Sequence, residues 1–98
     1  MAQVAQSDIR VSYNAKLRAV DPRWSDTSRA FDMTRTGCND IVVGWLNVYA
    51  GTHHGARMMA QTLTETARDC ETSSASMEFE WMGEQMQIVV HAVKRCDF

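Results

Sequence analysis

The chain has 98 residues, of which 45% are apolar and 22% are charged, and its formal net charge is −2. These totals predict a single small globular domain over residues 1–98, because a chain of this length holds only one hydrophobic core. They argue against nucleic-acid binding, which takes most of its affinity from basic residues that neutralise phosphates and normally shows as a basic stripe.

Cysteine usage and hydropathy predict a cytoplasmic protein. The three cysteines, Cys38, Cys70 and Cys96, are odd in number and widely spaced, which is typical of free thiols in a reducing compartment. The N-terminal residues lack the basic and apolar regions of a signal peptide. The longest apolar run, IVVGWL, is far shorter than the roughly 20 residues that span a bilayer, so we expect no membrane segment.

The first predicted element is a strand in the segment DIRVSYNAKLRAV. Apolar and polar residues alternate throughout it, which is the period-two pattern of a strand with one buried face. A loop follows that carries Trp24, a large side chain that rarely lies on a loop without covering something. Phe31 and Met33 alternate with polar neighbours and predict a shorter second strand.

The segment IVVGWLNVY is apolar at both alternating sets of positions and rich in β-branched residues. We therefore predict a central strand buried on both faces from Ile41 to Tyr49, with Gly44 marking a bulge or a close approach. The alternative is a buried helix capped by Asn39 or Asp40, because periodicity does not separate the two structures for a short apolar run.

The spacing of apolar residues becomes helical in the next segment. It predicts one long helix over about residues 53–70, with Thr52 as the N-cap residue. The apolar stripe of this helix consists of Ala56, Met59, Ala60, Leu63, Ala67 and Cys70.

The C-terminal segment predicts a β-hairpin over about residues 76–95. Gly83 suits the first position of a two-residue type II′ loop, Gly83–Glu84. Glu78 and Glu80 would project from one face of this hairpin. The other face would carry three apolar pairs: Trp81 with Met86, Phe79 with Ile88, and Met77 with Val90.

Together these elements predict the order β-β-β-α-β-β, a two-layer α+β fold in which a mainly antiparallel sheet carries one long helix on one face. The opposite face would carry Arg10, Lys16 and Arg18 from the first strand and Glu78 and Glu80 from the fourth. Their opposite charges favour these two strands as neighbours. A third and least favoured alternative is a nucleic-acid binder that uses these three basic side chains, because the overall charge of the chain argues against this function.

The adjacent histidines His53 and His54 are the most conspicuous candidates for chemistry. Neighbouring residues in a helix point about 100° apart, so the pair lacks the i, i+4 spacing of helical zinc ligands. The simplest interpretation is a solvated first turn. The alternative is a pocket that Asn47 and Tyr49 line beside the two histidines.

Other catalytic or cofactor signatures are missing from the sequence. The cysteines lack the close spacing of zinc sites, and there is no glycine-rich phosphate loop or nucleophile motif. We therefore expect no metal and no cofactor, and we favour a non-catalytic protein.

Seven methionines and three tryptophans are more than the core of so small a domain comfortably accommodates. Methionine adapts to irregular partners, and tryptophan anchors interfaces. We therefore predict a surface that binds another protein, with contacts at Trp24, Met58 and Met82 and a charged rim at Glu78 and Glu80.

The sequence thus favours a non-catalytic protein of the inhibitor or accessory type that binds another protein and also self-associates. Small proteins encoded by phages and other mobile elements, including anti-defence proteins, have this profile. The alternative is a small dimeric α+β enzyme or ligand-binding protein with its pocket near His53 and His54.

Overall fold

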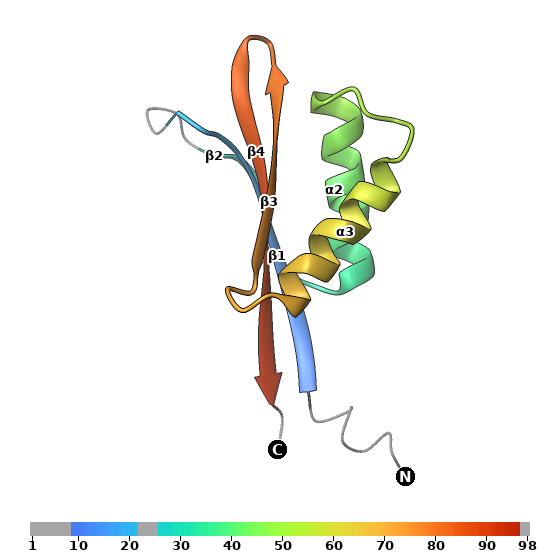
Figure 1. Cartoon of the computed structure of the whole chain (residues 1–98), viewed down its shortest axis with the longest axis vertical. Helices are drawn as coiled ribbons and strands as arrows, with labels where there is room; N and C mark the ends of the chain where they lie inside the picture. The colour runs from blue at the N-terminus through green and yellow to red at the C-terminus, as the bar shows by residue number, and fades with distance from the viewer. Residues whose placement is uncertain (1–8, 22–25, 97–98) are drawn as a thin grey trace.

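The described residues fold into a four-stranded antiparallel sheet and two helices, arranged as Figure 1 shows. The computed structural model describes residues 9–21 and 26–96. The predicted α+β class is confirmed, but the element order is β-β-α-α-β-β, with two helices in place of one. In chain order the elements are β1 (Ile9–Ala19), β2 (Asp26–Met33), α2 (Arg35–Tyr49), α3 (Ala56–Asp69), β3 (Ser74–Trp81) and β4 (Glu84–Cys96).

The two central strands, β1 and β4, form the longest ladder of the sheet, and the predicted first strand is confirmed. β2 pairs with β1 and is longer than the pattern of Phe31 and Met33 indicated. Its ladder contains a bulge in which the N–H of Asp32, with a φ of 56°, donates to Asn14 Oδ1 at 2.8 Å. The core side chains of the two central strands are Tyr13, Ala15, Leu17, Ala19, Met86, Ile88, Val90 and Ala92.

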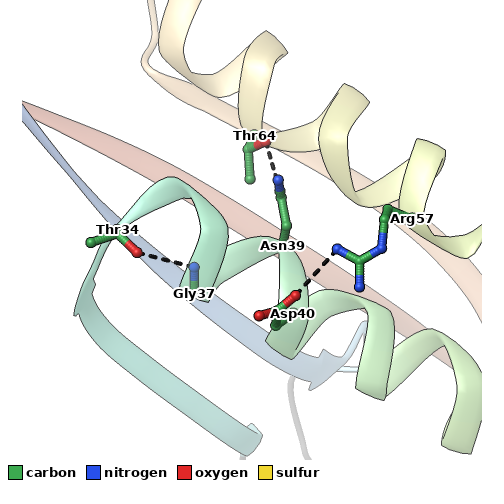
Figure 2. A network of polar contacts seen from close by, with 6 residues as sticks. All are labelled: Thr34, Gly37, Asn39, Asp40, Arg57 and Thr64. Carbon is green, nitrogen blue, oxygen red and sulfur yellow. Dashed lines mark hydrogen bonds and ion pairs between the residues drawn. The ribbon is translucent and has the colours of Figure 1, made fainter.

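Residues 41–49, predicted as a central strand, belong to the helix α2. The helix begins after Thr34, whose side chain accepts a hydrogen bond of 3.1 Å from the N–H of Gly37 (Figure 2). Asn39 and Asp40, the caps that the helical alternative suggested, lie inside the helix. The strand prediction assumed that the apolar residues are buried on both faces, and this was wrong. In the helix only the residues on one face are buried, and the remaining apolar residues of the run are partly or fully exposed. The buried residues of α2 are Cys38, Asn39, Val42, Trp45 and Leu46.

The predicted long helix is confirmed as α3, but it begins later than expected. Gly55 adopts the left-handed conformation, with a φ of 77°, immediately before the helix, so Thr52 does not cap it. His53 and His54 therefore lie in the connection between the helices. Four of the five buried residues of α3 are small, which lets the helix lie close to its neighbours: Ala56, Ala60, Leu63, Thr64 and Ala67. Neither described helix is long and apolar enough to cross a membrane.

Two polar contacts join α2 to α3, and both are drawn in Figure 2. The Thr64 hydroxyl donates to Asn39 Oδ1 at 2.9 Å, and both side chains are buried. The Arg57 guanidinium lies 3.2 Å from an Asp40 carboxylate oxygen in an exposed ion pair. The buried contact fixes the distance between the helices more strongly, because breaking it would leave an unsatisfied polar group in the core.

The predicted C-terminal hairpin is confirmed, with a different turn and register. The two loop residues are Met82 and Gly83, and both have positive φ, 52° and 82°, which is the signature of a type I′ turn. The strands are shifted by two residues from the predicted pairing. A shift of two leaves every side chain on its predicted face, because side chains alternate along a strand. The observed pairs are Trp81 with Glu84, Phe79 with Met86, and Met77 with Ile88.

The first strand was predicted to lie beside the strand that carries Glu78 and Glu80, which is β3 in the structure. The strand order β2-β1-β4-β3 shows that this prediction was wrong. β4 lies between β1 and β3, so Lys16 and Arg18 are separated from Glu78 and Glu80 by the width of one strand. The order makes β2 and β3 the two edge strands. α2 packs over β1 and β2, and α3 packs over β4 and β3, so one face of the sheet carries both helices.

Candidate protein-binding site

The residues predicted to line an alternative pocket lie at the end of α2 and in the connection to α3. His53 and His54 both have exposed side chains. The ring of Tyr49 packs edge-on against Trp81 with a centroid distance of 5.1 Å, so it joins α2 to the hairpin. Asn47 Oδ1 is buried and has no hydrogen-bond partner among the described residues. The two cavities described below are lined by other residues.

The described residues that were predicted to bind a partner are exposed, but they lie on three different parts of the fold. Met58 on α3 is 72% exposed, and Met82 in the hairpin turn is 84% exposed. Glu78 and Glu80 are exposed on β3. Trp24 lies outside the described residues.

The two flanks of α3 differ in what they contact. Arg57 and Thr64 lie on the flank that faces α2, where each makes a polar contact with that helix. Met58 and Thr62 lie four residues apart on the other flank, where the Thr62 hydroxyl donates to the Met58 carbonyl at 2.9 Å. This second flank has no helix beside it in the described part of the chain, and it lies toward β3.

An open apolar groove of about 450 Å³ lies along this second flank. Methionine side chains from both layers line it, two from α3 and one from β3, and we call it the methionine groove. Its lining residues are Gly55, Met58, Met59, Thr62 and Met77. Methionine is flexible and polarizable, so such a groove can adapt to apolar side chains of different shapes.

Two residues of the methionine groove were assigned to the core by the sequence patterns. Met59 belongs to the predicted apolar stripe of α3 but is 43% exposed, because the stripe is narrower than the pattern indicated. Met77 lies on the apolar face of the hairpin, as predicted, but only half-buried at the edge of the sheet. The large number of methionines was the signal for this surface, although it did not place the individual residues.

The strand beside the methionine groove has an unpaired edge. β3 is the outermost strand, so no described strand pairs with the backbone groups along its outer side. Glu78 and Glu80 project from the face of β3 away from the helices, while Met77 projects toward α3. Along the edge of β3, backbone groups that pair with no described strand therefore lie between an apolar groove on one side and two carboxylates on the other.

A second, more polar cavity of about 410 Å³ lies at the C-terminal end of α3. Hydrogen bonding with the Thr72 side chain and with the Ser74 backbone lowers the pKa of the Cys70 thiol. Burial raises the pKa of the Cys38 thiol to about 11. Cys70 is therefore the more easily ionised of these two thiols. The cavity is lined by Glu65, Thr66, Asp69 and Cys70.

Neither a metal-binding cluster among the described residues nor a similar protein of known function indicates what this site binds. Within residues 9–21 and 26–96, no group of three or more histidine, cysteine, aspartate or glutamate side chains could hold a metal ion. Comparison of the chain with protein-family models, with curated proteins and with solved structures gives no significant match.

Proposed function

We propose that the protein is non-catalytic and acts by binding another protein along the outer edge of β3. The observation that carries this proposal is the methionine groove, an open apolar cavity beside an unpaired edge strand. An exposed apolar surface of this kind is costly in water and is typical of interaction sites.

The unpaired edge favours a partner segment in extended conformation. Such a segment can add to the sheet as a further strand, because its backbone groups would pair with those along the outer side of β3. Backbone pairing supplies affinity, and alternate side chains supply specificity. The side chains that point toward α3 would enter the methionine groove beside Met58 and Met77.

The two carboxylates of β3 favour basic residues at the alternate positions of the partner segment, on the face away from the methionine groove. Glu78 and Glu80 project from the face of β3 opposite the groove, and an opposite charge on a neighbouring strand stabilises a pair by about 0.2–1 kcal/mol. The preferred segment thus alternates apolar residues with lysine or arginine. Met82, in the hairpin turn after β3, is a further exposed apolar side chain.

A small protein that occupies a strand-forming segment of another protein acts as an inhibitor or accessory subunit. The size of the chain and the lack of a catalytic signature support this role. Anti-defence proteins of phages or other mobile elements, acting in the cytoplasm, belong to this class.

Photo-crosslinking in the native host tests the proposal. Benzoylphenylalanine placed at Met58 should crosslink to one protein, through a segment that alternates apolar and basic residues when mapped by mass spectrometry. Val48 is the matched control position, since it is also 72% exposed but lies on α2, outside the methionine groove. Equal crosslinking from both positions, or crosslinks from Met58 to an acidic or helical segment, would contradict the proposal.

A further inference from the structure

The face of the sheet away from the helices separates its charges. The ladders place Arg18, Gln87 and Glu78 in one row across β1, β4 and β3. In the next row Lys16 lies beside Val89 of the central strand. On this face the basic side chains of β1 therefore lie on one side of β4, and the acidic side chains of β3 lie on the other.

The middle of this face is partly apolar. Val89 and Val93 of β4 project from it, because the alternate residues of the same strand are buried under the helices. No described element covers these valines: both helices pack on the opposite face, as Figure 1 shows. On this face β4, with its two valines, thus lies between the basic side chains of β1 and the acidic side chains of β3.

We infer that a second copy of this chain stacks on the helix-free face, with a two-fold axis that runs along β4. This axis exchanges the basic side of one copy with the acidic side of the other. Arg18 then lies opposite Glu78 of the second copy, and the reciprocal pair forms by symmetry. Val89 and Val93 meet their own counterparts at the axis.

The charge pattern selects this orientation. A two-fold axis across the strands would place Arg18 near Arg18 and Glu78 near Glu78, which repel. With the axis on β4, three strands of each copy, β1, β4 and β3, overlap and present roughly 450 Å² in projection, below the size of a standard specific interface. We therefore expect a weak dimer that forms at hundreds of micromolar and weakens further as salt is added.

Sedimentation velocity on purified chains tests the dimer without any other protein. Arg18→Glu and Glu78→Arg should each weaken self-association by roughly tenfold or more, because each places like charges opposite one another. An equimolar mixture of the two variants should dimerise again, since the mixed dimer contains only opposite pairs. The matched controls Arg35→Glu and Glu71→Arg change the charge equally at exposed positions outside this face and should dimerise normally.

Three results would overturn the inference. One is a wild-type chain that stays monomeric at millimolar concentration. The second is a dimer that neither single variant weakens, and the third is a mixture of the two variants that fails to dimerise. Because the purified chain contains no other protein, these results are independent of whether the methionine groove binds a partner.

Discussion

Cys38 and Cys70 are thiols in contrasting surroundings. Cys38 is fully buried, and burial raises its pKa to about 11, whereas hydrogen bonds lower the pKa of Cys70. Because the thiolate is the reactive form, Cys70 should be alkylated by iodoacetamide at pH 8 while Cys38 is protected. Its rate should rise with pH until the lowered pKa is passed. Peptide mapping by mass spectrometry measures the alkylation of each cysteine. Equal alkylation of Cys38 and Cys70 in the native protein would contradict the predicted difference in reactivity.

The buried hydrogen bond between Thr64 and Asn39 makes a specific contribution to stability. Thr64→Val keeps the side-chain volume but leaves the Asn39 amide unsatisfied, which should lower the free energy of unfolding by about 2 kcal/mol. Thr62→Val is the matched control, because Thr62 is exposed and bonds only to its own helix. Its effect should stay within about 0.5 kcal/mol in urea denaturation. Equal losses for the two variants would show that the buried contact contributes nothing.

At the scale of elements, α2 shows how a short apolar run acquires its conformation. The run from Ile41 to Tyr49 fits a buried strand and a helix equally well by periodicity. Thr34 begins the helix, and the four-residue spacing of Cys38, Val42 and Leu46 places those side chains on one buried face. Two of the residues that decide the conformation, Thr34 and Cys38, therefore lie before the run itself.

Gly44 provides a test of the helical conformation. A Cβ added at Gly44 meets no atom within 4 Å, and alanine is the better helix former by about 1 kcal/mol. Gly44→Ala should therefore raise the free energy of unfolding by about that amount. Gly55→Ala is the opposite control: the φ of Gly55 is 77°, so the same substitution should lower stability by about 1 kcal/mol. Thermal and urea denaturation measure both, and destabilisation by Gly44→Ala would argue against the open space at this position.

At the scale of the whole molecule, the two helices and four strands of the described residues leave two surfaces uncovered. Both helices pack on one face, so the other face, with Val89 at its centre, is uncovered in the described part of the chain. The flank of α3 away from α2 and the edge of β3 form the methionine groove. The proposed dimer and the proposed partner segment use different surfaces, so one assembly can contain both.

The sequence by itself determined the elements with a clear period. β1, α3 and the C-terminal hairpin follow their patterns, because alternate or helical spacing of apolar residues leaves only one way to bury them. It also determined which face of each hairpin strand is buried. Met58 was recognised as surface because it falls outside the apolar stripe of α3.

Only the tertiary structure decided the conformation of residues 41–49, the strand order and the hairpin register. A register shift of two residues keeps each side chain on its face, so the pattern cannot detect it, and the left-handed conformations of Met82 and Gly83 select the turn. The methionine groove also depends on tertiary packing. Met59 and Met77 are distant in sequence, and α3 brings them together because it packs over the edge strand β3.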